Sequence, residues 1–128
     1  MKVKIIRIIK EQDNSAQVTF WTASGSAQAE WVGTRPEVGG MYDAEVEVPE
    51  SLVWGDGIRQ VAAMEPGIAT TDGTTIITGM LDSLEDDGVA TVRLGDSLLL
   101  VETEGLPGQV GSSVQLATRQ LRLFDANL

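Results

Sequence analysis

Polar and apolar side chains alternate without interruption along the stretch MYDAEVEV, residues 41–48, which gives the clearest indication of the fold. Such a period of two is typical of a β-strand with one buried and one exposed face. The apolar face holds Tyr42, Ala44, Val46 and Val48, and the polar face holds Asp43, Glu45 and Glu47. These three carboxylates would repeat every ~6.6 Å, as an anionic stripe that can oppose a row of Lys or Arg side chains on a partner. A solvated strand face, or protection of a sheet edge against aggregation, is the alternative interpretation.

Similar short runs extend on both sides of this strand and predict an all-β protein. Asp-Gly pairs at Asp56-Gly57 and Asp87-Gly88 are typical of tight hairpin turns. Ile58, Val61 and Ala62 also have helical spacing, so one short helix there is an alternative. We expect strands over residues 2–9, 16–22, 27–32, 41–48, 52–54, 58–64, 74–84, 89–94, 97–103 and 113–124.

A shift of 72 residues superimposes the second half of the chain on the first and predicts an internal repeat. The shift pairs Ile5 with Ile77 and brings glycines between strands into register, for example Gly33 with Gly105. We therefore expect two tandem small Greek-key barrels, residues 1–64 and 74–128, with a linker over residues 65–73. A single continuous β-sandwich is the alternative.

The strand sequence of each half resembles an OB-fold. The second half is also similar to the transport-associated OB (TOBE) domains that follow some transporter ATPases, over residues 75–79, 92–95, 110–111 and 121–125. That resemblance implies substrate or oxyanion sensing. The Ser- and Lys-rich anion-binding positions of the molybdate-binding modules have no counterpart here, and the chain lacks a phosphate-binding Gly-Lys-Ser/Thr loop.

Composition excludes several function classes. The 128 residues carry 9 basic and 19 acidic side chains, a net charge of −10, which repels the phosphate backbone of nucleic acids. There is no cysteine and no histidine, so the usual nucleophile-base pairs and the commonest transition-metal ligands are missing. We therefore expect a protein that is not an enzyme and that has no metal site and no cofactor.

No apolar run reaches the ~20 residues that span a bilayer, and Lys4 and Arg7 interrupt the apolar amino terminus. We expect a soluble, cytoplasmic protein without a membrane partner, and the sequence leaves its oligomeric state open. The seven residues DSLEDDG, 82–88, lack the ligand spacing of a calcium loop and predict a hairpin turn.

The three tryptophans all lie in the first half of the chain. Trp31 shares a strand face with Ala27 and Ala29, so we expect it in the core. Trp21 and Trp54 are expected at the surface, where they could stack on a base or a sugar beside Arg35 and Arg59. The alternative is that they cover the open end of a barrel.

The leading functional hypothesis is a non-catalytic module that presents an acidic surface to a basic protein, as an inhibitor or immunity protein does against a nuclease toxin. Its expected contact residues are Asp43, Glu45, Glu47, Trp21, Trp54, Arg35 and Arg59. One alternative is a small-ligand or oxyanion sensor of TOBE type with its site between the two barrels. Another is a single-strand nucleic-acid binder that uses the tryptophans and arginines, although the net charge makes nucleic acid a poor partner.

Overall fold

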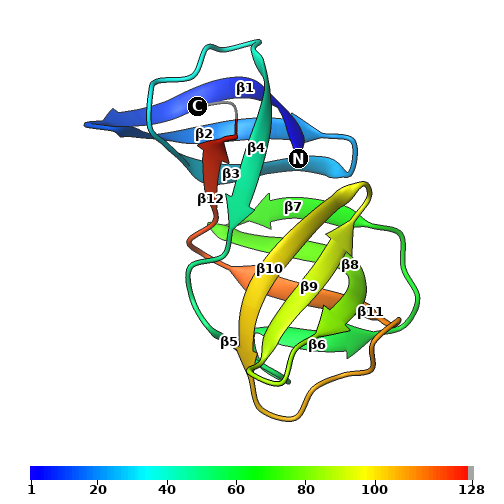
Figure 1. Ribbon diagram of the computed structural model, residues 1–128. Coiled ribbons are helices and arrows are strands. Elements are labelled where there is room, and N and C mark those ends of the chain that lie inside the picture. Colours follow the sequence, from blue (N-terminus) through cyan, green and yellow to red (C-terminus); the bar gives the residue numbers. More distant parts are fainter. Residues whose placement is uncertain (127–128) are drawn as a thin grey trace.

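The computed structural model describes residues 1–126, which form twelve strands and no helix. The chain folds into two barrel-like sheets, one above the other (Figure 1). The predicted all-β class with two tandem barrels is therefore confirmed. The strands are β1 (Lys2–Gln12), β2 (Ser15–Thr22), β3 (Gly25–Val32), β4 (Met41–Glu47), β5 (Leu52–Val53), β6 (Ile58–Val61), β7 (Gly67–Thr71), β8 (Thr74–Leu84), β9 (Val89–Leu94), β10 (Ser97–Glu104), β11 (Ser113–Thr118) and β12 (Arg122–Asp125).

The first barrel is closed, with the strand order β1-β2-β3-β12-β4 and a final pairing of β4 with β1. Its closing strand β12 runs parallel to β3 and antiparallel to β4. The long β1 carries two register shifts, between Ile5 and Arg7 and between Ile8 and Lys10. Such bulges bend a strand, so they let β1 follow the curved wall of a small barrel.

The second barrel repeats this scheme with the order β5-β10-β9-β8-β11-β6. The remaining strand, β7, pairs with residues 74–78 in the first half of β8. Here β5 runs parallel to β10, and β6 runs antiparallel to β11. The two short strands are consecutive in the chain and are joined by a bridge between Trp54 and Ile58. β5 and β6 together take the place between β10 and β11 that β12 takes between β3 and β4. The second barrel is therefore nearly closed.

The strand pairings cross the expected boundaries of residues 1–64 and 74–128. Strands β5 and β6 follow the first four strands in the chain but pair with the second barrel, and β12 follows the second barrel but closes the first. The expected single strand over residues 113–124 is therefore two strands, which belong to different barrels. The segment 65–73, expected to be a linker, contains β7. The short helix considered at residues 58–62 is wrong, because β6 is a strand there.

The 72-residue repeat is visible in the strand registers. Val18 lies opposite Ala29 in the first barrel, and Ala90 lies opposite Val101 in the second, so both partners are displaced by 72 positions. The first strands depart from this shift, since Phe20 faces Ile5 whereas Val92 faces Leu81. Ile5 therefore corresponds to Leu81 and not to Ile77, because the first hairpin is four residues longer. An alignment without gaps cannot accommodate that difference.

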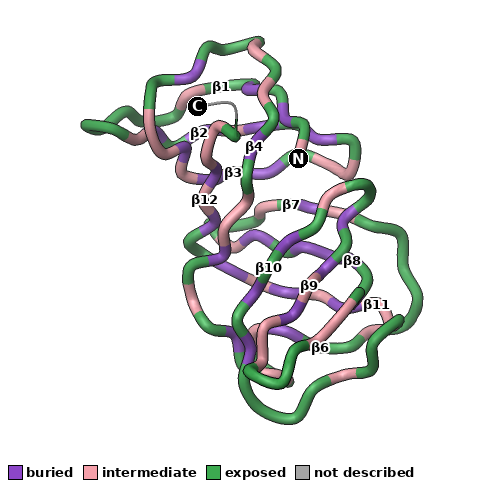
Figure 2. The backbone as a smooth tube through the Cα atoms, in the orientation of Figure 1, coloured by how far each residue is buried: buried purple, intermediate pink, exposed green. Residues whose placement is uncertain are grey.

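Buried residues alternate with exposed ones along most strands (Figure 2). The buried hydrophobic side chains form one core cluster with members from both barrels. Trp31 is 1% exposed, which confirms its predicted place in the core. Its ring lies 4.9 Å from that of Tyr42, and its Nε1 donates a hydrogen bond to the Thr34 carbonyl. Among residues 1–126 there is no helix long and apolar enough to cross a membrane.

Candidate functional site

The predicted acidic stripe lies on the outer face of β4, as the alternation implied. Asp43 and Glu45 are exposed on either side of the buried Ala44. The stripe is not a row of unopposed carboxylates, because Asp43 lies opposite Lys2 on β1 and Glu47 forms a 3.2 Å ion pair with Arg122. Among the described ion pairs none involves Glu45. Glu45 is therefore the member of the stripe with most freedom to meet a basic group on a partner.

Glu45 lines a groove between the two barrels, where β4 passes close to β10 (Figure 1). The groove has a volume of about 370 Å³. Its floor includes the chain start, whose amino group donates a 2.7 Å hydrogen bond to the Ala44 carbonyl. We call this surface the β4–β10 groove, and its residues are Met1, Ala44, Glu45, Val46, Ser97, Leu98 and Leu100.

Two leucines make one wall of the β4–β10 groove apolar. Leu98 is 55% exposed and Leu100 is 67% exposed, both on the outer face of β10. The same face continues with the exposed Glu102 and Glu104. An exposed apolar pair beside carboxylates is an arrangement that suits recognition of an apolar side chain with basic neighbours.

Sequence analysis missed these two leucines, although a signal for them exists. Leu98, Leu99 and Leu100 form an unbroken apolar run, which conceals the alternation of the strand. Glu102 and Glu104, later in the same strand, must face the solvent because they are charged. Since every second side chain of a strand lies on the same face, Leu98 and Leu100 lie on that outer face too.

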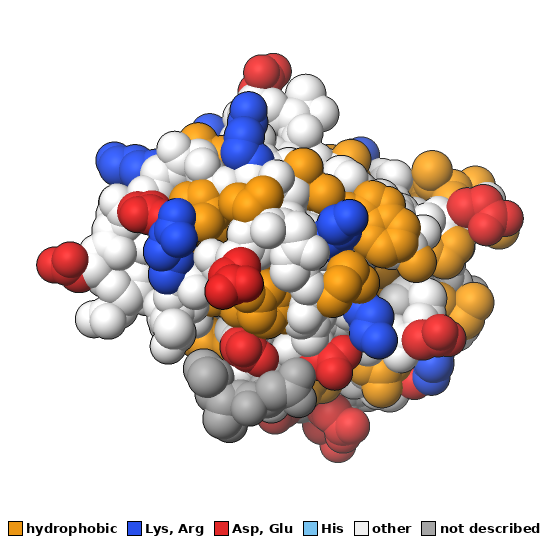
Figure 3. All heavy atoms as spheres, turned by 90° about the horizontal axis from the view of Figure 1, so that it is seen from above, with side chains coloured by type: hydrophobic (Ala, Val, Ile, Leu, Met, Phe, Trp, Pro, Cys, Tyr) orange, Lys and Arg blue, Asp and Glu red, His pale blue; other side chains and the backbone are white. Residues whose placement is uncertain are grey.

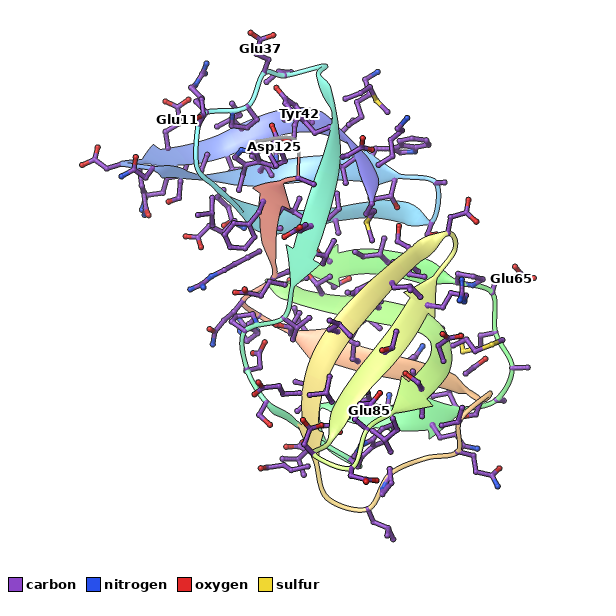
Figure 4. The ribbon with its side chains drawn as sticks, in the orientation of Figure 1. Glu11, Glu37, Tyr42, Glu65, Glu85 and Asp125 are labelled. Carbon is purple, nitrogen blue, oxygen red and sulfur yellow. The ribbon has the colours of Figure 1, made fainter. Side chains whose placement is uncertain are left out.

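The acidic charge is concentrated on the second barrel. Residues 1–48 and 122–126 carry six basic and eight acidic side chains, a net charge of −2, whereas residues 49–121 carry three and eleven, a net charge of −8. Seen from above, the first barrel shows basic and acidic side chains interspersed with hydrophobic ones (Figure 3). Acidic side chains reach both ends of the molecule, with Glu37 at one end and Glu85 toward the other (Figure 4).

The proposed platform of tryptophans and arginines is divided between the two barrels. Trp21 is 44% exposed on β2 of the first barrel, opposite Lys4. Trp54 lies between β5 and β6 of the second, where it packs against the core and its Nε1 donates a 3.0 Å hydrogen bond to Thr103 Oγ1. Their expected basic neighbours are divided in the same way.

Arg35 belongs to the first barrel and forms an ion pair with Glu11. Arg59 is exposed on β6 of the second barrel. The four residues of the platform therefore do not belong to a single sheet face.

The acidic segment 82–88 ends in the predicted hairpin turn. The Gly88 amide donates to the Glu85 carbonyl, and the Val89 amide donates to Asp87 Oδ1 at 3.1 Å. Asp82 instead faces Arg93 across the β8–β9 pair, at 3.4 Å. Within residues 1–126 no group of three or more acidic, His or Cys side chains is arranged to hold a metal ion.

Comparisons with protein-family models, with curated proteins and with solved structures find no match to this chain. The two barrels are compatible with OB-like folds, but the comparisons add no support for the narrower resemblance to TOBE domains.

Proposed function

We propose that the protein is a non-catalytic binding module that docks a basic protein in the β4–β10 groove. The observation that carries the proposal is the exposure of Leu98 and Leu100 in a groove that also holds Glu45. The expected ligand surface is an apolar anchor side chain with Lys or Arg beside it. The partner class is that of a basic enzyme held by an inhibitor or immunity protein, as a nuclease toxin is.

Apolar burial would supply most of the affinity. Full burial of an exposed leucine side chain contributes about 1.5 to 3 kcal/mol, and about half to two thirds of that surface is still open at Leu98 and Leu100. Two such side chains in one hollow are enough to form the centre of an interface, where a few well-packed residues dominate the binding energy. On the opposite wall Ala44 is buried and Val46 is partly buried against the core, so Leu98 and Leu100 provide the apolar contact.

The negative charge of the chain would raise the association rate with a basic partner and select against acidic ones. The groove borders the barrel that carries a net charge of −8, and Glu102 continues the outer face of β10 beyond the leucines. A field of this sign attracts a basic partner during diffusion and repels an acidic one. Exposed charges are screened by salt, so we expect the association rate to fall as the salt concentration rises.

The test is affinity capture from the native host with the wild-type chain and a groove variant, Glu45→Lys with Leu98→Ser and Leu100→Ser. Leu106→Ser is the matched control, because Leu106 is 91% exposed in a loop outside the groove. The captured protein is purified and its affinity for each variant is measured by calorimetry.

We expect a basic protein that binds the wild type and the Leu106 variant equally and the groove variant at least tenfold more weakly. Equal binding by the groove variant, or capture of an acidic partner only, would overturn the proposal. If the chain itself forms dimers that the groove variant abolishes, the occupant is a second copy and the proposed partner class is wrong.

A further inference from the structure

A polar cavity lies at the junction of the two barrels, outside the β4–β10 groove. Its volume is about 250 Å³, which leaves room for several water molecules. Three parts of the chain surround it: the outer face of β2 and β3, the β7–β8 hairpin, and the segment between β11 and β12. We call it the junction cavity, and its lining residues are Gln17, Gln28, Ala29, Glu30, Thr70, Gly73, Thr75, Arg119, Gln120, Leu121 and Arg122.

The two arginines of the junction cavity differ in what surrounds them. Arg122 is neutralised by Glu30 at 3.3 Å and by Glu47 at 3.2 Å. None of the ion pairs found in residues 1–126 involves Arg119. In a chain with a net charge of −10, a guanidinium without a carboxylate partner beside a cavity is a local excess of positive charge.

Arg119 is held in place by the β7–β8 hairpin. Its Nη1 donates a 2.9 Å hydrogen bond to Thr74 Oγ1. Gly73, at φ +79°, has no side chain, and a Cβ there would lie 3.1 Å from Nη2 of Arg119. The turn therefore provides a hydrogen-bond acceptor and leaves space for the guanidinium, which is exposed at the edge of the junction cavity.

The other lining groups suit hydroxyls. Gln17 and Gln28 present side-chain amides, each with donors and an acceptor. Thr70 Oγ1 lies 2.7 Å from Thr75 Oγ1, and it also accepts a hydrogen bond from the backbone N–H of Gln28 at 2.9 Å. Amide, hydroxyl and carboxylate groups around one cavity can bind several hydroxyl groups of a ligand, while a guanidinium pairs with a carboxylate.

We propose that the junction cavity binds a small hydroxylated carboxylate of the sugar-acid type, with its carboxylate on Arg119 and its hydroxyls on the amide side chains. The proposal is independent of the docking of a protein partner, because no residue of the β4–β10 groove lines this cavity. A ligand at this place touches both barrels and the segment that leads into β12. Its binding therefore stabilises the folded state as a whole.

The experiment is calorimetry and thermal unfolding of the full chain with sodium gluconate, sodium glucuronate and sodium tartrate, against sodium chloride and glucose. The test variant is Arg119→Gln, and the matched control is Arg59→Gln, which removes one positive charge from an exposed position on β6 outside the cavity. A second variant, Gln17→Ala, removes one amide.

We expect saturable binding of at least one hydroxylated carboxylate, with a rise in unfolding temperature that salt and glucose do not reproduce. The Arg119 variant should bind about tenfold more weakly and the Gln17 variant several-fold more weakly, while the Arg59 variant keeps wild-type affinity. The proposal is overturned if none of the three ligands binds below about 10 mM, if glucose binds equally well, or if both arginine variants lose affinity alike.

Discussion

The two barrels share one strand order but fill their interiors differently. In the first barrel Trp31 lies on β3 opposite Leu123 of the closing strand. The corresponding position on β10 is Thr103, which lies opposite Leu52 of its own closing strand. The second barrel receives its indole from the closing segment instead, since Trp54 follows Leu52 by two residues and donates its hydrogen bond to Thr103.

The two barrels therefore share the pairing scheme and the position of a buried leucine, but a different strand supplies the large aromatic side chain in each. Leu123 and Leu52 are both buried, at equivalent places beside the third strand of each barrel. An interior must be filled to high density, but either wall can supply the volume. Two barrels related in this way therefore have few identical residues at equivalent positions.

The largest expected effect comes from the two closing leucines. Leu123→Ala and Leu52→Ala should each lower the free energy of unfolding by about 2 to 5 kcal/mol, because each deletes buried methyl groups from a packed barrel. Urea unfolding followed by tryptophan fluorescence measures both. Leu106→Ala, at an exposed loop position, should change stability by less than about 0.5 kcal/mol. A negligible loss for only one of the two leucines would break the equivalence of the closing strands.

The contact between the barrels gives the next largest effect. Gly25, at φ +137°, lies where a Cβ would be 2.3 Å from the Ile68 carbonyl oxygen of β7. Gly25→Ala must therefore displace the β2–β3 turn from the second barrel, and should cost about 2 to 3 kcal/mol by thermal or urea unfolding.

The control for Gly25 is Gly39→Ala, where φ is +86° but no atom lies within 4 Å of the new Cβ. This change carries the backbone strain alone and should cost about 1 kcal/mol. Equal losses at the two glycines would mean that the close approach to β7 contributes nothing.

Substitution of the two tryptophans measures how much each barrel depends on its indole. Trp31→Phe removes part of a fully buried ring and should cost about 2 kcal/mol, whereas Trp54→Phe removes a half-buried ring edge and one hydrogen bond and should cost about 1 kcal/mol. Because each variant lacks one tryptophan, its equilibrium unfolding is followed by far-UV circular dichroism and not by fluorescence. The reverse order would show that the second barrel depends more on its indole than the first.

The smallest effect concerns the ion pairs of Arg122, which link β12 to β3 and β4. Its side chain is 43% exposed, so Arg122→Gln should lower stability by no more than about 1 kcal/mol and by less at high salt. Arg93→Gln removes a single exposed pair from the second barrel and serves as the comparison. Urea midpoints at low and high sodium chloride measure both, and a loss that does not depend on salt would indicate packing and not charge.

Much of the fold follows from local pattern. The alternation in residues 41–48 and 89–94 places the strands and their inner faces correctly, because a half-buried strand needs a period of two. The strand β7 was missed because Gly67, Ala69 and two threonines have no strong alternation, and its place depends on pairing with β8. The candidate site was predicted only in part: Glu45 was named, but its apolar neighbours Leu98 and Leu100 lie on β10, 53 and 55 positions away in the chain.

An all-β chain with a tandem repeat and a strongly negative charge follows from the order and composition of the residues, as does the absence of cysteine and histidine chemistry. Only the tertiary structure decided which strand closes which barrel, because a short strand such as β5 or β12 carries no local signal of its distant partner. The same long-range pairing brings Glu45 beside Leu98 and encloses the junction cavity beside Arg119. Both candidate surfaces therefore depend on contacts between segments that are far apart in the chain.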